Sequence, residues 1–424
     1  MPSIKALVGY QSVLAKFQCS YHRRANMIAD DIQPPTIAER GLTRGLMLLL
    51  AITGFAVGGV MHAHSPVLGA MAQEFGVDAA AIGWVATLTF AGYFAGLLFI
   101  VPIGDRIDKR HLILAQLCVL IIDVFVLAMS SSLAVMIAGS FIIGACVCLT
   151  QNLVPIAMGM SRPNERGRVV GTILMAMFLG FLFNRLASGL IGAWLGWRWS
   201  FVFAGLVLCP VAVAVFAHLP SVAPTTRMGY GALLASVWTL FRSSRSLRLT
   251  SATQFFLAVG YGGFWATLAP MLMLLHGMGP AEAGLMAIPG AAGVLISRAA
   301  GRWMDRSGAM PVVVSSIFVY IASMVVLGFS AWWIGAIILG AAIMDCGIRG
   351  AIVANQTLVA NVDAEARNRS NTIFGAHNWG GKTVGAFLAS MTLANFGWVP
   401  VCGIFIAGAV VALGLQWRLI DTRN

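Results

Sequence analysis

The sequence predicts an all-α membrane protein of twelve transmembrane helices, arranged as two pseudo-symmetric bundles of six. The composition is the first reason: 59% of the 424 residues are hydrophobic and only 10% are charged, whereas an ordinary soluble domain is about 25% charged. A soluble core cannot bury so much apolar surface, so a bilayer must surround most of the chain. A series of apolar runs and an internal repeat are the other two reasons.

Twelve apolar runs bounded by Gly, Pro or charged residues are long enough to cross a hydrocarbon core of about 30 Å. They are continuously apolar, without the alternation of β-barrel strands, and an open strand would leave backbone groups unpaired in lipid, so we expect helices. The runs are 45–68, 81–103, 111–130, 132–158, 169–193, 199–218, 250–275, 281–300, 310–329, 331–358, 370–393 and 396–417. Residues 45–218 and 250–417 are the two predicted bundles.

The basic residues lie almost entirely on one side of these spans. Among the 27 Lys and Arg residues, the exceptions are Arg198 on the opposite side and three residues inside spans. Because cytoplasmic loops are enriched in Lys and Arg, both termini are expected in the cytoplasm, with the chain in a bacterial inner membrane. The net charge of +12 is then a topology signal and a lipid contact rather than a nucleic-acid site.

The segments outside the spans are the two tails and one long connection. Residues 219–249 divide the spans six and six, and apolar side chains at helical spacing between Tyr230 and Phe241 predict an amphipathic helix on the membrane surface. Residues 1–44 lack the apolar core of a cleavable signal peptide. We expect 1–44 and 418–424 to be cytoplasmic, with Met1 and Met27 both open as the start.

The two halves repeat each other. Gly104-Asp105-Arg106 follows the second span, and Gly301, Asp305 and Arg306 follow the eighth. Residues 164–168 precede the fifth span, and the similarly charged residues 363–369 precede the eleventh. A parallel repeat of two halves is typical of one large class of transporters.

These motifs resemble those of the major facilitator superfamily over residues 43–417. Gly-Asp-Arg-Ile-Asp-Lys-Arg at 104–110 resembles the loop signature of that superfamily, and 301–308 resembles its second copy. The stretches 101–106, 230–234, 263–269 and 355–359 resemble the arabinose-efflux-like permease branch. The resemblance implies a secondary transporter that works by alternating access.

The sequence departs from two patterns of that superfamily. Asn184-Arg185 stand where the antiporter signature of the fifth helix has Gly-Pro, and Ala138-Gly139-Ser140 stand where many drug exporters carry a basic residue. These departures argue against assigning a multidrug–proton antiporter specifically.

The charged residues of the repeated loops are candidates for a gate. A carboxylate after the second or eighth span can accept hydrogen bonds from a helix N-terminus of the other half and pair with the arginines there. The alternative is that these residues only fix the topology. The expected pairs are Asp105 with Arg367 and Arg369, and Asp305 with Arg166 and Arg168, with Arg106, Arg110 and Arg306 completing the motifs.

Five ionisable residues lie inside the spans, namely Asp123, Arg185, Asp345, Arg349 and Lys382. A charge at the bilayer centre costs at least about 2.5–3.5 kcal/mol on insertion scales, so each requires a partner or a wet cavity. Asp345 and Arg349 are four residues apart on one helical face, and they are either a structural pair or a proton-binding carboxylate with its partner. Asp123 lies in a peripheral span, and we expect a structural role for it.

Arg185 and Lys382 occupy corresponding spans of the two halves. If both face a central cavity, they are placed to bind an anion; the alternative is that they extend to lipid headgroups. Polar and aromatic residues complete the candidate cavity, and an ordinary interhelical hydrogen bond is an equal alternative for each. They are Gln151, Asn152, Tyr261, Trp265, Asn355, Gln356 and His377, with His62 and His64 late in the first span also considered.

The sequence lacks a phosphate-binding Gly-rich loop with Lys-Ser or Lys-Thr, a metal-ligand cluster and a nucleophile elbow. Neither an ATP-driven pump nor an enzyme is expected, and no cofactor besides a coupling proton. We expect a monomeric secondary transporter for a small polar or amphipathic solute, with proton-coupled export favoured. The open alternatives are proton-coupled uptake of an organic anion and, from another class, a membrane sensor or scaffold without flux.

Overall fold

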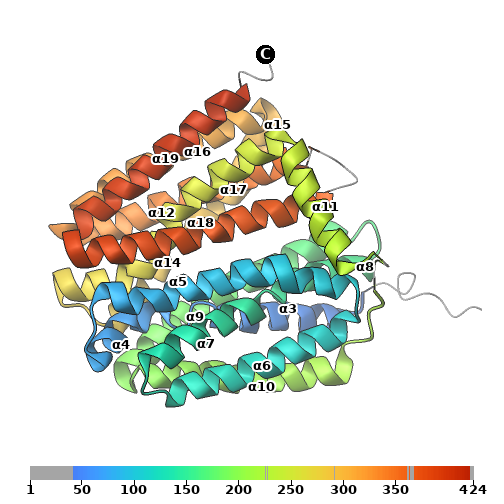
Figure 1. The fold of residues 1–424 in the computed structure, drawn as a ribbon, viewed down its shortest axis with the longest axis horizontal. Coiled ribbons are helices and arrows are strands. Elements are labelled where there is room, and N and C mark those ends of the chain that lie inside the picture. Colours follow the sequence, from blue (N-terminus) through green and yellow to red (C-terminus); the bar gives the residue numbers. More distant parts are fainter. Residues whose placement is uncertain are drawn as a thin grey trace, which may run out of the picture.

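A computed structural model describes residues 42–420 except 225, 227, 291, 361 and 363–366. Within these residues the chain is helical, without a β-strand. Figure 1 shows the helices in two groups, with the N-terminal half (blue to green) below and the C-terminal half (yellow to red) above. The predicted all-α fold of two bundles is therefore confirmed.

The N-terminal half contains six membrane-crossing segments, several of which are broken into shorter helices. They are α3 (Arg44–Val60) with α4 (Leu68–Phe75), α5 (Ala79–Ala95) with a π-helical turn (Gly96–Ile100) and a 3-10 turn (Val101–Asp105), α6 (Lys109–Met129), α7 (Leu133–Val147) with α8 (Thr150–Gly159), α9 (Arg166–Trp194) and α10 (Trp197–His218).

The C-terminal half repeats this arrangement after a surface helix, α11 (Tyr230–Ser243), which Figure 1 shows at the right-hand side of both halves. Its segments are α12 (Arg245–His276), α13 (Pro280–Leu285) with α14 (Ala287–Gly290) and α15 (Ala292–Ser307), α16 (Ala309–Gly328), α17 (Gly335–Ala360), α18 (Arg367–Phe396) and α19 (Trp398–Ile420). The predicted tail 1–44 lies almost wholly outside the described residues.

Ten helical segments of the described chain are long and apolar enough to cross a membrane. The other two expected spans are also helical but fall short of that standard for different reasons. The segment 280–307 is interrupted near Pro289 and carries several charges towards its end, whereas α18 is unbroken but holds His377, Asn378 and Lys382. Together they complete twelve segments.

Glycine turns mark the internal repeat in the backbone. Gly76 and Gly277 end the first segment of each half with φ of 63° and 64°, and Gly196 and Gly397 join the last two segments with φ of 93° and 79°. Both pairs are separated by the same number of residues. A left-handed conformation is strained for any residue with a Cβ, so these positions require glycine.

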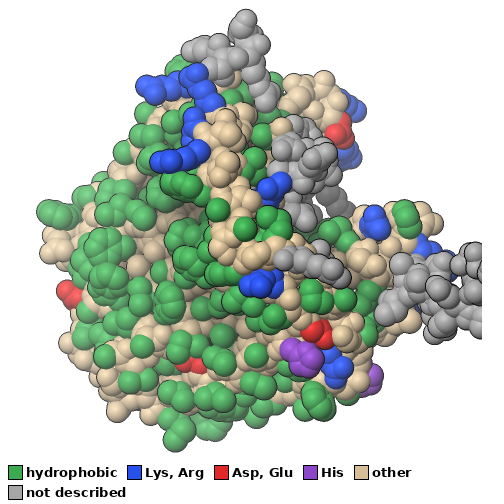
Figure 2. All heavy atoms as spheres, turned by 45° about the vertical axis from the view of Figure 1, so that its right-hand side comes forward, with side chains coloured by type: hydrophobic (Ala, Val, Ile, Leu, Met, Phe, Trp, Pro, Cys, Tyr) green, Lys and Arg blue, Asp and Glu red, His purple; other side chains and the backbone are tan. Residues whose placement is uncertain are grey.

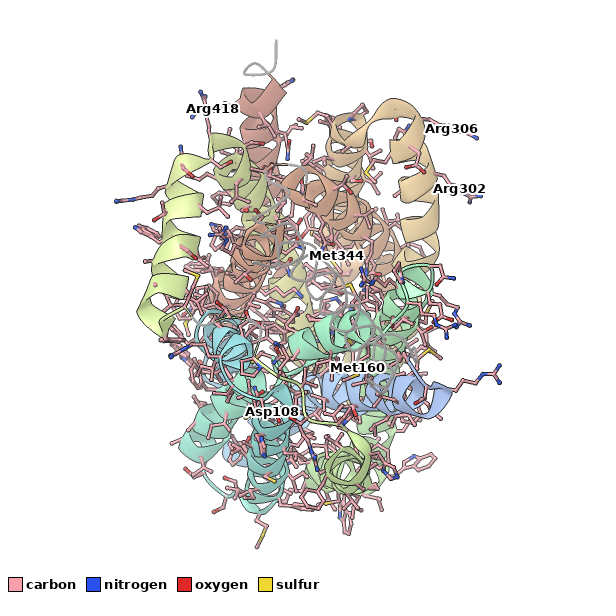
Figure 3. All side chains as sticks on the ribbon, turned by 90° about the vertical axis from the view of Figure 1, so that its right-hand side faces the viewer. Asp108, Met160, Arg302, Arg306, Met344 and Arg418 are labelled. Atoms are coloured by element: carbon pink, nitrogen blue, oxygen red, sulfur yellow. The ribbon has the colours of Figure 1, made fainter. Side chains whose placement is uncertain are left out.

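The charged loops gather at one end of the molecule, which we call the basic end and define by Asp105, Arg166 and Arg306. Figure 3, viewed from this end, shows Arg302 and Arg306 projecting outward from α15 and Arg418 from the end of α19. In Figure 2, hydrophobic side chains cover most of the visible surface away from it. Which side of the membrane the basic end faces stays a prediction.

Exposed tryptophans lie near both ends of the helices. Trp194, Trp199, Trp332 and Trp333 are exposed near the opposite end, and Trp238, Trp303 and Trp417 near the basic end. Tryptophan is enriched where hydrocarbon meets headgroups, so exposed tryptophans at these two levels are what a membrane-spanning fold leads us to expect.

The two halves pack tightly at the opposite end. A Cβ on Gly189 of α9 would lie 2.6 Å from the carbonyl oxygen of Pro280 and 2.8 Å from the Cα of Gly284. A Cβ on Gly83 of α5 would clash with the side chain of Ser390 on α18. Because the two halves approach this closely at both points, the space between the halves is closed at this end.

Candidate functional site

A cavity of about 690 Å³ lies between the two halves near the middle of the helices. Both halves contribute aromatic and cationic side chains to its wall, and aliphatic residues fill the space between them. The N-terminal half supplies His62, Phe178, Phe181 and Arg185, and the C-terminal half supplies Tyr261, Trp265 and Arg349.

Local breaks in the helices place some of these side chains. Helix α3 ends at Val60, and a short turn through His62 leads to Pro66, so His62 lies at an irregular point of the first segment. Proline has no N–H and its ring clashes with the carbonyl four residues earlier, here that of His62, so a regular α-helix cannot continue through Pro66. In contrast, α9 is continuous past Phe178 and Arg185, and the two side chains lie two turns apart on one face.

Arg185 crosses from one half to the other. Its side chain is only 8% exposed, and its guanidinium lies 3.7 Å from the ring centre of Trp265. Its Nη2 is 3.2 Å from Nδ1 of His62. Arginine carries only donors, so His62 accepts this bond at Nδ1 and holds no proton there. Arg185 thus lines the cavity between the halves, and its role in binding an anion stays a prediction.

Asp345 forms a small network at the cavity wall. The residue is fully buried; its Oδ1 accepts a 3.2 Å hydrogen bond from the hydroxyl of Tyr261, and its Oδ2 lies 3.4 Å from Nε of Arg349. Both partners line the cavity, whereas Asp345 lies one layer behind them. Arg349 also lies 4.4 Å from the ring centre of Phe178 in the other half.

Lys382 does not line the cavity. Its ammonium lies 3.8 Å from the ring centre of Trp379 and 5.3 Å from that of Tyr261. Trp379 in turn stacks on Tyr93 of the other half at 4.0 Å, and Tyr93 accepts a 2.6 Å hydrogen bond from Gln151. The cavity wall therefore does not bring Lys382 and Arg185 together in the positions expected for binding one anion.

The remaining polar candidates lie elsewhere. Asn355 belongs to a buried chain of amides, described below, and Asn152 lies beside Gly104. Gln356 is exposed. His377 lies against Phe241 of α11 in a separate apolar groove of about 450 Å³.

Four amide side chains connect four helices of the C-terminal half. Gln254 of α12 donates to Asn378 of α18 at 2.9 Å, Asn355 of α17 donates to Gln254 at 3.3 Å, and Gln416 of α19 donates to Asn355 at 3.2 Å. Asn355, Gln254 and Gln416 are fully buried. In lipid such bonds hold helices together, so the four linked amides join these helices of the C-terminal half into a single unit.

The predicted gate is only partly visible. Asp105 forms an ion pair with Lys109 at 3.3 Å within its own loop and takes part in further interaction. Among the described residues Asp305 is exposed and forms no ion pair with Arg166 or Arg168, and Arg168 pairs with Glu165 at 3.6 Å.

The other arginines of the predicted gate are placed as follows. The side chain of Arg367 lies outside the described residues, while Arg369 and Arg106 are exposed and Arg110 donates to the carbonyl of Phe216. The gating role stays a prediction.

Asp108 attaches the connection between the halves to the N-terminal bundle. It caps α6, and its carboxylate accepts hydrogen bonds from Ser221 Oγ at 2.6 Å and Val222 N at 2.9 Å. Partial burial alone would raise the pKa of Asp108, but these bonds and that from Arg110 N outweigh it and hold the pKa below its usual value. The segment after α10 is thus fixed at the basic end, where Figure 3 labels Asp108.

The described residues contain no group of three or more His, Cys, Asp or Glu side chains placed to hold a metal ion. The residues of the cavity wall offer charge, hydrogen bonding and aromatic contact. Two halves, a repeat of six segments, and a cavity between the halves that is closed at one end form the architecture of a transporter that alternates access.

The sequence model of the Major Facilitator Superfamily matches residues 50–363. The chain belongs to the Major Facilitator Superfamily. It is 31% identical over 374 residues to an Escherichia coli O157:H7 protein described as the uncharacterized transporter YgaY, covering 88% of this chain and 94% of that one. It is 28% identical over 377 residues to the probable transporter SCO4007 of Streptomyces coelicolor, covering 86% and 85%.

Solved structures show the same fold. A point mutant of the nucleoside transporter NupG superposes with a TM-score of 0.75 at 15% identity, covering 88% of this chain and 99% of that chain. These similarities make this superfamily member a multi-pass membrane transporter and not an enzyme.

Sequence reasoning missed part of the cavity of this transporter. Phe178 and Phe181 looked like any other apolar residues of a span, and His62 was one polar residue among several. The spacing of Phe178, Phe181 and Arg185 on one face of α9 was the available signal, but only the packing of α9 against the other half identifies that face as the cavity wall.

Proposed function

We propose that this superfamily member is a proton-coupled secondary transporter of small amphipathic organic anions. One observation supports the proposal most directly. Arg349 lines the cavity and also pairs with the buried carboxylate of Asp345 at 3.4 Å. Two cations, Arg185 and Arg349, line the cavity, and Lys382 lies outside its wall, whereas Asp345 is the acidic partner in this network.

A proton on Asp345 would change what Arg349 offers to the cavity. When Asp345 is ionised, it neutralises Arg349; when Asp345 is protonated, the guanidinium has no carboxylate partner and is available to an anion in the cavity. Proton binding and anion binding therefore favour each other, and by linkage each raises the affinity for the other by the same factor.

Mutual stabilisation of this kind supports movement of the proton and the anion in the same direction. An inward proton gradient would then drive uptake, which is one of the alternatives left open by the sequence. Export of the solute, which the sequence favoured, requires proton and solute to compete for one site. The net positive charge near the cavity supports co-transport of an anion over that arrangement.

The basic end supports a location in the bacterial inner membrane with that end, and hence the C-terminal end of α19, in the cytoplasm. The motifs in 101–106, 230–234 and 355–359 support membership of the arabinose-efflux-like branch. We also propose that a monomer transports, because each chain contains a complete cavity formed by its own two halves.

The test is proton movement in proteoliposomes that contain the purified full chain and an internal pH dye. Addition of an aromatic sulfonate, which does not cross a bilayer unaided, is expected to acidify the interior in wild-type liposomes. Asp345→Asn is expected to retain exchange of labelled anion across the membrane and to lose the proton signal. Asp123→Asn is the matched control, because it changes a different buried carboxylate, located on α6, and it should behave as wild type.

Two outcomes would contradict the proposal. One is a proton signal of unchanged size in Asp345→Asn, because the carboxylate would then not carry the proton. The other is a wild-type protein that transports no anion in liposomes but exchanges a cationic or neutral solute for protons. That result would favour export by competition instead.

A further inference from the structure

We propose that the anionic group of the solute binds between Nε of Arg185 and Nε1 of Trp265, and that the solute is a monoanion with one aromatic or cyclic apolar body. This inference rests on the proposed function, because it names the solute class and the subsite within the same cavity. It places the hydrogen bonds of the anion on Arg185 and Trp265, while Arg349, once Asp345 is protonated, adds positive charge to the same cavity.

Two donors at the cavity wall have no partner. Nε of Arg185 and Nε1 of Trp265 are both buried and form no hydrogen bond with any described residue. Their side chains are 8% and 3% exposed, and both line the cavity. Buried donors in native proteins are almost always paired, so two orphaned donors on one cavity wall indicate a ligand that accepts from them.

The guanidinium of Arg185 is held in one orientation before any ligand arrives. The indole of Trp265 supports one face at 3.7 Å, and His62 accepts from Nη2 at 3.2 Å. His62 is itself held edge-to-face by Phe181, with ring centres 5.3 Å apart. A fixed planar fork loses little freedom when it binds a carboxylate, which favours affinity and geometric selection.

The other two cations are engaged differently. Arg349 pairs with Asp345, and the ammonium of Lys382 rests on the rings of Trp379 and Tyr261 away from the wall. Arg185 has no acidic partner among the described residues, so the cavity offers one uncompensated guanidinium. A second anionic group on the same solute would meet apolar wall or Arg349, whose charge Asp345 neutralises while it is ionised; this explains the expected preference for one charge.

The rest of the wall fits an apolar ring. Phe178, Leu179 and Phe181 line it from α9, and Ile288 and Ile338 line it from the other half. Aromatic side chains prefer offset or edge-to-face contact with another ring, and the volume of about 690 Å³ accommodates a solute of a few rings at most. A carboxylate next to a ring satisfies the donors and the wall together.

The experiment measures binding of matched probes to the full chain in nanodiscs by titration calorimetry. The probes are phenylacetate, phenylacetamide, which has the same ring without the charge, and acetate, which has the charge without the ring. Phenylacetate is expected to bind at least about tenfold more tightly than either of the others, since a hydrogen bond to a charged group is worth about a factor of ten or more.

Conservative variants then locate the subsite. Arg185→Lys keeps the charge but removes the planar fork, and Trp265→Phe keeps a ring but removes the N–H. We expect a loss in affinity of about tenfold or more for the first and roughly threefold for the second, because the second removes one neutral donor. Lys382→Gln is the control cation and should bind phenylacetate as wild type does.

The subsite is wrong if phenylacetamide binds as tightly as phenylacetate, or if Lys382→Gln loses binding while Arg185→Lys and Trp265→Phe keep it. Failure of the proposed function gives a different result: carboxylates would bind in an Arg185-dependent way while wild-type liposomes show no proton movement. Conversely, proton-coupled flux of an anion that is unaffected by Arg185→Lys would overturn the subsite and leave the proposed function standing.

Discussion

The guanidinium of Arg185 and the indole of Trp265 lie 3.7 Å apart, and the two residues belong to different halves of the transporter. Phe178 and Arg349 form a second contact between a cation and a ring, at 4.4 Å. In this contact the N-terminal half provides the ring and the C-terminal half provides the cation. Both contacts are at the cavity, so a solute that enters it meets the interface between the two halves.

Closure at the opposite end should depend on the absence of a side chain at Gly189. A Cβ there meets the backbone of Pro280 and Gly284, and overpacking of this kind costs about 1–3 kcal/mol. Gly189→Val should therefore hold this end open and abolish most flux in proteoliposomes. Gly171→Val on the same helix, where a Cβ has nothing within 4 Å, is the control, and equal flux in both variants would refute the idea.

The amide chain should be structural rather than part of the solute site. Asn355→Leu leaves Gln254 and Gln416 without their bonds to Asn355, and each buried polar group left unpaired costs about 1–3 kcal/mol. The variant should unfold at lower temperature in detergent, with an unchanged solute affinity in the fraction that stays folded. The neighbouring exposed Gln356→Leu should leave both quantities unaltered; a raised Kd in Asn355→Leu with normal stability would favour solute contact.

We expect Asp123 to lower the stability of the N-terminal half and to have no role in transport. The side chain is 7% exposed, Oδ2 has no hydrogen-bond partner, and a Cβ on the adjacent Gly139 would lie 2.8 Å from Oδ1. Asp123→Leu should raise the unfolding temperature, because an unpaired buried polar group costs about 1–3 kcal/mol, and it should keep wild-type flux. Loss of flux with increased stability would assign Asp123 a functional role instead.

Attachment of the segment after α10 should weaken in acid. The bonds to Asp108 lower its pKa in the folded chain, so their contribution is complete above the usual carboxyl pKa of 3.8 and is lost as the pH falls through the lowered value. Hydrogen exchange at Val222 should therefore accelerate only in strongly acidic buffer. Asp108→Asn should exchange faster at neutral pH and show little of this pH dependence, and equal exchange in both proteins would exclude the attachment.

Most of the fold could be predicted because the bilayer imposes it. Apolar runs located the spans, but helix ends follow capping residues instead of hydrophobic boundaries. Helix α12 begins at Arg245 rather than at 250, because Ser244 accepts a hydrogen bond from Leu247 N. Likewise α5 begins two residues before the predicted 81, where Asp78 accepts from Ala81 N. The break of the eighth segment near Pro289 was also not predicted.

The candidate site could be predicted only where its contacts are local. The approach of Asp345 to Arg349 follows from a spacing of four residues on one helix. The contact between Arg185 and Trp265 joins residues from different halves, so no spacing in the sequence reveals it. Asn355 was a cavity candidate because its amide lies in a span; its engagement by Gln254 and Gln416 depends on how α12 and α19 pack around α17.

The contrast between the amide chain and the cavity has a consequence for membrane voltage. Uncharged amides feel almost no force from a transmembrane potential, whereas an elementary charge that crosses it exchanges about 2.3 kcal/mol per 100 mV. The framework of the C-terminal half is thus indifferent to the potential, and the ionisable groups at the cavity are the parts that respond. If one proton accompanies one monoanion, their charges cancel, so the loaded and the empty carrier bear the same net charge and a complete transport cycle moves no net charge across the membrane.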